Sequence, residues 1–303
     1  MKSKFKRTIC CLAFSFAVAT LLPTLETVSA AEPESIPLWP DGAPGAIGKE
    51  AKDIPTLILY PAKKNPSGTA IVVCPGGGYG GLAMGHEGHE IAAWLNKNGI
   101  SVFICNYRHR GKGYGHPYPM MDAQRAIRIV RTNAKKWKVN PERVGIIGFS
   151  AGGHLASSCA THESIGDLDS TDPINKAACR PSFAILCYAV IGFDKPYTHR
   201  GSQRNLIGKE APKELVKFYS NEEQVSKETC PTFLWHTAED KAVPVQNSIY
   251  FYLACQKHNV PSAMHVFEKG RHGIGLARNN ETAKHWPDLC IGWLKQRGFM
   301  TAN

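Results

Sequence analysis

The stretch Gly148-Phe149-Ser150-Ala151-Gly152 places a serine between two glycines. The mainly apolar run 143–147 before it is typical of a buried strand, and residues 154–158 after it favour a helix. A serine at a sharp strand-to-helix turn forms a nucleophile elbow, in which small neighbours let the strand and the helix approach closely. The pattern therefore predicts that Ser150 is a nucleophile at a helix N-terminus, where free N–H groups favour developing negative charge. The alternative is an ordinary glycine-rich turn.

Strands and helices alternate along nearly the whole chain after residue 30. Besides the strand before Ser150, we expect strands at 56–60, 70–74, 101–107, 183–188, 231–236 and 263–267. This alternation predicts an α/β fold with a mostly parallel, doubly wound sheet, helices on both faces, and functional loops at the carboxyl ends of the strands. Residues 191–227 interrupt the pattern and are expected to form an insertion similar to a cap.

The first 30 residues have the features of a secretory signal peptide. Residues 2–7 are rich in Lys and Arg, residues 9–22 are mainly apolar, and Val28-Ser29-Ala30 is a small-residue cleavage site. Cleavage there leaves a single domain, 31–303, that is secreted or periplasmic. An uncleaved anchor is the alternative, but the apolar run is short and interrupted, so stable membrane insertion is not expected.

Charge and cysteine content argue against several classes of partner. The formal net charge is +11, but the positive residues are scattered and form no basic stripe with interleaved aromatics, so nucleic-acid binding is not expected. The chain has no Cys-x-x-Cys spacing, and His86 and His89 are three residues apart rather than the four of a zinc protease, so no metal is expected. Cys159 and Cys179 bracket a polar loop that a disulfide could close after export.

A glycine-rich loop follows the apolar strand at 70–74. Gly76, Gly77 and Gly78 are consecutive, and such a loop leaves backbone N–H groups free to point at a ligand. We therefore predict an oxyanion hole formed by the N–H groups of Gly77, Gly78 and Ala151. The alternative is a flexible loop without a ligand.

A serine nucleophile needs a base, and the base needs a carboxylate that orients it. In this architecture the acid and then the histidine follow the serine, each on a loop after a strand. Asp240 lies four residues beyond the strand that ends at His236, and His272 lies five residues beyond the strand that ends at Phe267. The sequence thus predicts a Ser150, Asp240 and His272 triad, with Glu239 as the competing acid and no metal or organic cofactor.

Aromatic and polar side chains lie in the loops around this predicted site. Tyr79, Tyr114 and His116 are expected to form a rim that binds a sugar. The alternative is that these side chains pack locally.

Taken together, these segments resemble secreted bacterial α/β-hydrolases of the acetyl xylan esterase and feruloyl esterase type, some of which are catalogued as xylanases. The segments that carry the resemblance are 75–81, 122–127, 148–155, 236–244 and 270–273. It implies the α/β-hydrolase fold and a serine carboxylesterase that removes acetyl or similar small acyl groups from polysaccharide. Pro75 departs from the pattern of lipase-like relatives, which have a histidine before the three glycines, and this leaves the support of the loop open.

Three other functions compete with this interpretation. A small-molecule carboxylesterase needs the same residues. A serine peptidase of the prolyl-oligopeptidase group shares the fold and the order of the triad but usually adds a propeller domain. A carbohydrate-binding protein on an inactive hydrolase scaffold is disfavoured because Ser150, Asp240 and His272 are all present. The sequence leaves the acyl group, the alcohol and the oligomeric state open.

Overall fold

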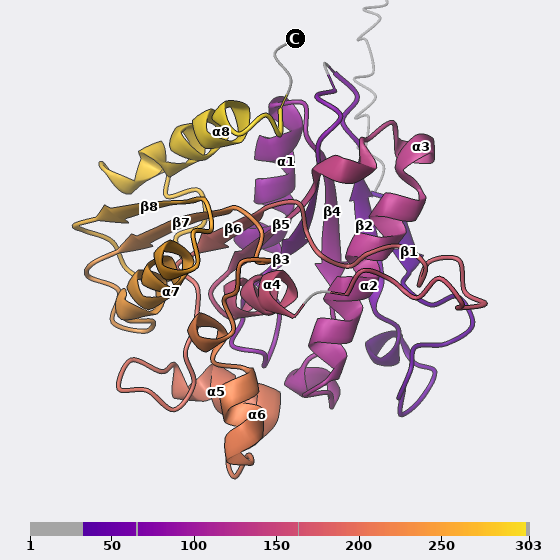
Figure 1. Ribbon diagram of the computed structural model, residues 1–303, viewed down its shortest axis with the longest axis horizontal. Helices are drawn as coiled ribbons and strands as arrows, with labels where there is room; N and C mark the ends of the chain where they lie inside the picture. The colour runs from indigo at the N-terminus through magenta and orange to yellow at the C-terminus, as the bar shows by residue number, and fades with distance from the viewer. Residues whose placement is uncertain (1–32, 65, 163, 301–303) are drawn as a thin grey trace, which may run out of the picture. The chain divides into compact units, whose positions relative to one another are not determined.

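The strands of the described residues form one sheet in the order β1-β2-β4-β3-β5-β6-β7-β8 (Figure 1). Their bounds are β1 (Ser35–Pro37), β2 (Thr56–Tyr60), β3 (Ala70–Cys74), β4 (Ser101–Asn106), β5 (Val144–Phe149), β6 (Ala184–Cys187), β7 (Thr232–Thr237) and β8 (Ser262–Phe267). β2 pairs antiparallel with β1 and β4, and all pairs from β4 to β8 are parallel. The mostly parallel α/β sheet predicted from the sequence is confirmed, whereas the short strand β1 was not predicted.

The computed structural model describes residues 33–64, 66–162 and 164–300. The predicted signal peptide, residues 1–30, lies outside these residues. From Pro33 onward the chain forms one compact unit. None of the helices in the described ranges combines the length and the apolar character that crossing a membrane requires.

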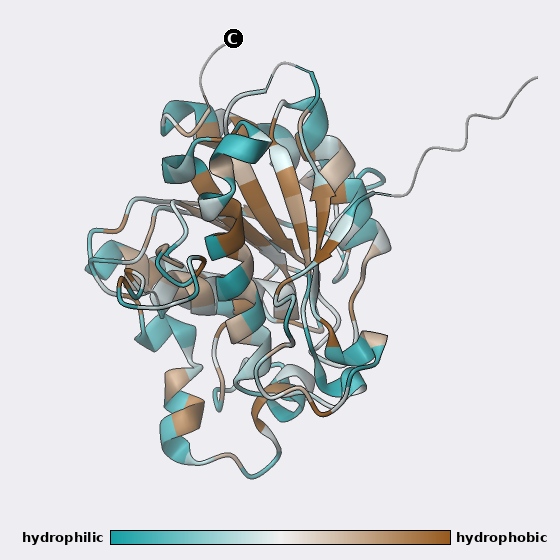
Figure 2. Cartoon of the chain, turned by 90° about the vertical axis from the view of Figure 1, so that its right-hand side faces the viewer, coloured by the Kyte–Doolittle hydropathy of each residue, from teal (hydrophilic) through white to brown (hydrophobic). Residues whose placement is uncertain are grey.

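Helices cover both faces of the sheet. They are α1 (Glu90–Lys97), α2 (Tyr118–Thr132), α3 (Ala134–Trp137), α4 (Ala151–Thr161), α5 (Arg200–Ile207), α6 (Lys213–Phe218), α7 (Gln246–Lys257) and α8 (Trp286–Gln296). Figure 1 shows α1 and α8 on one side of the sheet and α2, α4 and α7 on the other. This two-sided cover explains why the central strands are almost continuously apolar, and in Figure 2 they are the brown centre of the molecule.

Successive side chains of a central strand enter different cores. Ile71 and Val73 of β3 belong to the core under α1 and α8, whereas Val72 belongs to the core under α2, α4 and α7. This alternation follows from the two-residue period of a strand. It constrains the register of each strand, because a slip by one residue would exchange the side chains of the two faces.

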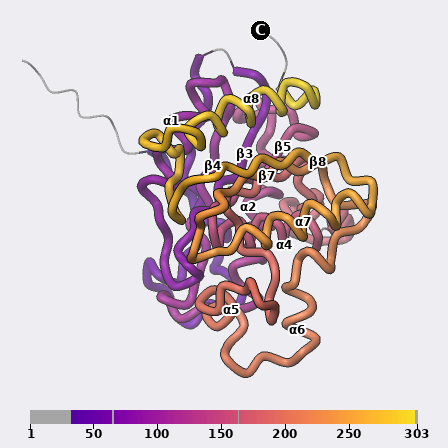
Figure 3. Tube along the Cα trace, turned by 90° about the vertical axis from the view of Figure 1, so that its left-hand side faces the viewer, coloured from indigo at the N-terminus to yellow at the C-terminus, as the bar shows by residue number. Residues whose placement is uncertain are grey.

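The segment between β6 and β7 contains α5 and α6, within the range 191–227 predicted as an insertion. Figures 1 and 3 both show these helices at one end of the molecule, away from α8. The side chain of Asn205 on α5 donates a hydrogen bond from Nδ2 to the carbonyl oxygen of Gly78, at 2.8 Å. The insertion therefore contacts the glycine-rich loop directly.

A buried ion pair ties the start of α2 to the loop after β4. Arg108 Nη2 lies 2.7 Å from Asp122 Oδ1, and both side chains are fully buried. The Arg108 guanidinium also donates to the carbonyl oxygen of Pro44 at 2.8 Å, and its carbon lies 4.7 Å from the ring centroid of Tyr118. Burial raises the pKa of Asp122, although the bonds from Arg108 act against this shift. Asp122 thus has a structural role, 14 residues from its partner in the sequence.

Replacing Asp122 with asparagine is expected to lower the free energy of unfolding by about 3–5 kcal/mol, because it leaves the Arg108 charge buried without its counter-ion. Chemical denaturation of the two proteins measures this difference. Glu90→Gln is the matched control, since the Glu90–Arg278 pair is largely exposed and its loss is expected to change stability by less than about 1 kcal/mol. Equal losses in the two variants would contradict the expectation.

Candidate active site

Ser150 occupies the turn between β5 and α4 in a strained backbone conformation. Its φ is 52° and its ψ is −121°, which a residue with a side chain rarely adopts. A β carbon on Gly152 would lie 2.0 Å from the carbonyl oxygen of Cys74, and one on Gly148 would lie 2.0 Å from that of Gly152. Only glycine fits at both positions, as the predicted elbow requires.

Ser150, His272 and Asp240 form a hydrogen-bonded chain. Ser150 Oγ lies 2.8 Å from His272 Nε2, and His272 Nδ1 lies 2.6 Å from Asp240 Oδ2. The residues follow β5, β8 and β7 respectively, so three parallel strands bring them to the same edge of the sheet. Ser150 is 7% exposed, and the His272 side chain is 23% exposed. The structure thus brings together the three residues that the sequence predicted as a triad.

The carboxylate of Asp240 is held in its ionised form. Burial alone would raise its pKa, but hydrogen bonds from His236, His272 and the N–H of Val243 outweigh burial and hold the pKa well below its usual range. Asp240 Oδ1 accepts from the N–H groups of Ala242 and Val243 at 3.0 and 2.9 Å. A charged carboxylate in this position orients the imidazole and stabilises its cation.

Glu239, the competing acid, points elsewhere. Its Oε2 accepts a hydrogen bond from the N–H of Gly270 at 3.2 Å, and the residue is exposed. Its contact is with the backbone of the loop after β8, residues 268–275, which we call the histidine loop, and not with the imidazole, which Asp240 holds.

The carbonyl groups of the glycine-rich loop are fixed by hydrogen bonds. The oxygen of Gly76 accepts from the N–H of Ala83 at 2.8 Å, and that of Gly77 accepts from the N–H groups of Gly80 and Gly81 at 2.9 and 3.1 Å. Because a trans peptide points its N–H opposite to its C=O, these bonds also fix the N–H groups of Gly77 and Gly78.

The loop runs beside the serine. A β carbon on Gly76 would lie 2.9 Å from Ser150 Cβ. Over residues 33–300, as far as they are described, no backbone acceptor meets the N–H groups of Gly77, Gly78 or Ala151. These are the three groups predicted as an oxyanion hole, and this geometry leaves them available to an acceptor on a ligand.

Comparison with known proteins adds to this geometry. Residues 57–254 match the model of the BD-FAE family. The chain belongs to the BD-FAE family. It is 39% identical over 219 residues to the acetylxylan esterase of Xylanibacter ruminicola, and the match covers 70% of this chain and 42% of that protein. It is 35% identical over 236 residues to endo-1,4-beta-xylanase B of Butyrivibrio fibrisolvens, covering 77% of this chain and 36% of that protein. The chain therefore spans less than half the length of these two curated relatives.

A solved structure matches over nearly the full chain. The crystal structure of an acetyl ester-xyloside bifunctional hydrolase from Caldicellulosiruptor lactoaceticus is 42% identical, with a TM-score of 0.84, and the match covers 90% of this chain and 100% of that one. The predicted α/β-hydrolase fold and the resemblance to the acetyl xylan esterase type are confirmed by these matches.

Two of the expected rim residues are buried in this BD-FAE protein. Tyr79 is 1% exposed and its hydroxyl lies 2.9 Å from His154 Nδ1. Tyr114 is 1% exposed and donates to Asp53 Oδ1 at 2.5 Å. A buried tyrosine hydroxyl needs a protein partner, and both have one. Their rings do not reach solvent, so we do not propose them as substrate contacts.

His116, the third expected rim residue, is exposed. Its Nδ1 lies 2.7 Å from the hydroxyl of Tyr219, which follows α6. It links the loop after β4 to the insertion and stays available to a ligand at the surface.

His199, at the start of α5, is a site residue that sequence reasoning missed. Its Nδ1 accepts from the N–H of Ser202 at 3.3 Å, so its Nε2 carries the proton in the neutral ring. A β carbon on Gly78 would lie 3.9 Å from its Cε1. Burial lowers the pKa of His199, and the neighbouring His272 lowers it further. The insertion carries no recognisable motif, so only the fold reveals this position.

Two further predictions concern cysteines and metals. Cys159 and Cys179 are both buried thiols, without a disulfide between them, and Cys179 Sγ accepts from the N–H of Ser164 at 3.1 Å. Among the described residues, no group of three or more His, Cys, Asp or Glu side chains is arranged to hold a metal ion.

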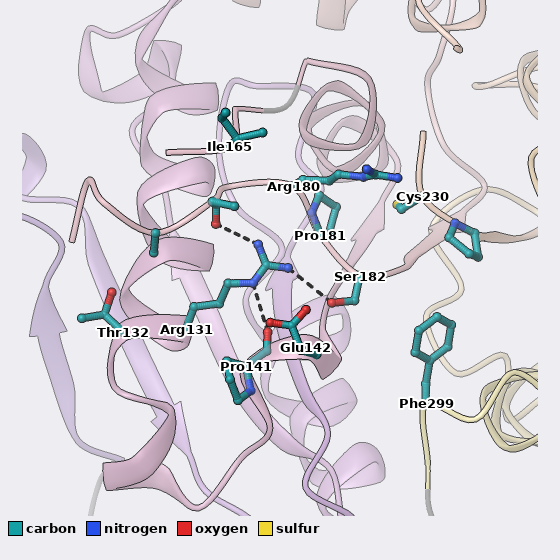
Figure 4. Close-up of a pocket in the computed structure, with 13 residues that line it drawn as sticks. Arg131, Thr132, Pro141, Glu142, Ile165, Arg180, Pro181, Ser182, Cys230 and Phe299 are labelled. Atoms are coloured by element: carbon teal, nitrogen blue, oxygen red, sulfur yellow. Dashed lines mark hydrogen bonds between the residues drawn. The ribbon is translucent and has the colours of Figure 1, made fainter. Parts of the chain in front are cut away.

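A hollow of about 650 Å³ lies at the opposite edge of the sheet (Figure 4). Its wall includes Arg131, whose guanidinium donates to the carbonyl oxygens of Pro141 and Ala178 and to Ser182 Oγ. The segments around it precede β5, β6 and β7, whereas the predicted triad follows β5, β7 and β8. Because the guanidinium of Arg131 is hydrogen-bonded to other residues of the protein, we assign this hollow no part in the reaction of Ser150.

Proposed function

We propose that this protein is a serine carboxylesterase that removes acetyl or similarly small acyl groups from polysaccharide. The observation that carries the proposal is the chain of hydrogen bonds from Ser150 through His272 to Asp240, at 2.8 and 2.6 Å. The names of the matched proteins, an acetylxylan esterase and an acetyl ester-xyloside hydrolase, support a carboxylic ester hydrolase. With its predicted signal peptide, the enzyme acts outside the cytoplasm.

In the first half of the reaction, Ser150 Oγ attacks the carbonyl carbon of the ester. His272 Nε2 removes the hydroxyl proton, and Asp240 stabilises the resulting imidazolium. The negative charge that develops on the carbonyl oxygen is held by the N–H groups of Gly77, Gly78 and Ala151. When the intermediate collapses, the bond to the alcohol breaks and His272 returns its proton to the leaving oxygen.

In the second half, water hydrolyses the acyl-enzyme. His272 removes a proton from the water, and the hydroxide attacks the acyl carbon bound to Ser150 Oγ. Collapse of this second intermediate breaks the bond to Ser150, which regains its proton from His272. The products are the free acid and the original enzyme, so the residues described suffice for the cycle.

The proposed polysaccharide preference predicts a ranking of substrates. We expect kcat/KM per acetyl group for acetate release from acetylated xylan to exceed that for ethyl acetate, whose alcohol is likewise a poor leaving group, by about tenfold, because contacts remote from the ester worth ~1.4 kcal/mol are used in the transition state. Acetate is measured directly in each case. The reverse ranking would favour the small-molecule carboxylesterase.

A further inference from the structure

Glu87 is a buried acid that the reaction described above does not use. It lies in the π-helical turn Gly85–His89 before α1 and is 2% exposed. Its nearest basic group is His86 Nε2, 3.6 Å from Oε1, and within the described ranges no lysine or arginine pairs with it. A carboxylate is seldom buried unless hydrogen bonds or opposite charges compensate for the loss of water.

One oxygen of Glu87 supports the glycine-rich loop. Oε2 accepts from the N–H of Gly76 at 2.8 Å, and a β carbon on Gly76 would lie 2.6 Å from the same oxygen. The carbonyl of the same peptide unit, that of Pro75, accepts from the hydroxyl of Tyr107 at 2.6 Å. The first peptide of the loop is thus held from both sides. Pro75 stands where lipase-like relatives have a histidine, which leaves open what supports the glycine-rich loop. Glu87 supplies this support.

The other oxygen of Glu87 reaches the histidine loop through one tyrosine. Oε1 accepts from the hydroxyl of Tyr188 at 2.8 Å, and that hydroxyl accepts from the N–H of Gly275 at 2.9 Å. The ring of Tyr188 also packs edge-on against the imidazole of His272, with 5.1 Å between the ring centroids. Tyr188 therefore contacts both the backbone after His272 and the imidazole ring of His272.

We propose that Glu87 is a positioning residue which, through Tyr188, holds the glycine-rich loop and the histidine loop in one fixed geometry. The inference rests on the esterase function proposed above. Among the described residues, the hydrogen bonds of Glu87 go to Gly76 and Tyr188, and none goes to Ser150 or His272. Each of its carboxyl oxygens accepts one hydrogen bond, from Gly76 N–H on one side and from the Tyr188 hydroxyl on the other. Catalysis needs the oxyanion-binding N–H groups and the base placed within about 0.5 Å of the productive geometry. The pair of Glu87 and Tyr188, which we call the brace, positions both.

Glu87→Gln and Tyr188→Phe test the proposal, each retaining the size of the side chain. For 4-nitrophenyl acetate, we expect each variant to lower kcat about tenfold and to change KM less than about twofold, since substrate binding does not involve the brace. The double variant should lose less than the product of the two single losses, because both substitutions alter the same contact between residues 87 and 188.

Two neighbouring variants serve as matched controls. Glu90→Gln makes the same change three residues along the chain, at a carboxylate bonded to Arg278. Tyr60→Phe removes a tyrosine hydroxyl bonded to His89. Both should keep the wild-type kcat and KM. A merely structural role for Glu87 predicts instead a lowered melting temperature with wild-type kcat in the folded fraction.

Folded Glu87→Gln with the kcat of wild type would overturn the proposal. If that variant does not fold, Tyr188→Phe, which keeps Glu87, decides: a kcat lowered about tenfold supports the brace, and an unchanged kcat rejects it. Failure of the esterase function is distinguishable, because it shows as an inactive wild type. The rate of Ser150 labelling by a fluorophosphonate then replaces kcat as the readout, with the same ratios expected.

Discussion

Ser150→Ala is expected to lower kcat for 4-nitrophenyl acetate by a factor on the order of 10⁶, the size of loss found when a triad serine is removed from a serine protease. The reason is the contact between Ser150 Oγ and His272 Nε2, at 2.8 Å. Without this hydroxyl no covalent intermediate forms, and what remains is the weaker catalysis by the oxyanion-binding N–H groups. Release of 4-nitrophenol measures the loss, and a fluorophosphonate probe should label the wild type but not the variant.

Ser157→Ala provides the control within the same helix. Ser157 Oγ donates to the carbonyl oxygen of His154 at 2.9 Å and lies in the buried part of α4. The Ser157→Ala variant should therefore keep its esterase activity and should still be labelled by the fluorophosphonate probe. Equal rates for Ser150→Ala and wild type would remove the basis of the proposed mechanism. An unlabelled, inactive wild type that still binds xylan would favour the carbohydrate-binding alternative.

That Ser150, Asp240 and His272 lie together was predictable because each has a local signal. Ser150 stands between two glycines after an apolar strand, and Asp240 and His272 each follow a strand in the expected order. The parallel sheet then brings these residues close together, since the carboxyl ends of its strands lie at one edge. Burial was harder to predict. Tyr79 and Tyr114 look like exposed loop aromatics until their partners, His154 and Asp53, are seen.

Glu87 and His199 had no such local signal. Glu87 lies between His86 and His89, whose spacing concerns only metal binding. Its partners Gly76 and Tyr188 are 11 and 101 residues away in the chain. His199 stands at the start of a helix in an insertion without a motif. Contacts of this kind depend on tertiary packing, which strand and helix periodicity does not encode.

The pH dependence of the reaction follows from the state of Asp240. Its hydrogen bonds hold its pKa well below the ordinary value, so the carboxylate is charged throughout the neutral and mildly acidic range. A group with a lowered pKa in the folded state stabilises the protein above its unfolded pKa, about 3.9 for Asp, and that contribution is lost as the pH falls below it. Loss of activity on mild acidification should therefore not reflect protonation of Asp240.

Asp240→Asn is expected to lower kcat by about 10³- to 10⁴-fold while the fold remains, because an amide neither fixes the tautomer of His272 nor stabilises its cation. The present carboxylate accepts His272 Nδ1–H at 2.6 Å, and an asparagine that turns its NH₂ toward the ring would favour the wrong tautomer. kcat for 4-nitrophenyl acetate, measured from pH 5 to pH 9, tests this. Glu239→Gln, next in the chain, should keep more than about a third of the activity, since a hydrogen bond of the exposed Glu239 to Gly270 N–H is worth little. If Glu239→Gln lost more activity than Asp240→Asn, the acid of the triad would have been assigned to the wrong neighbour.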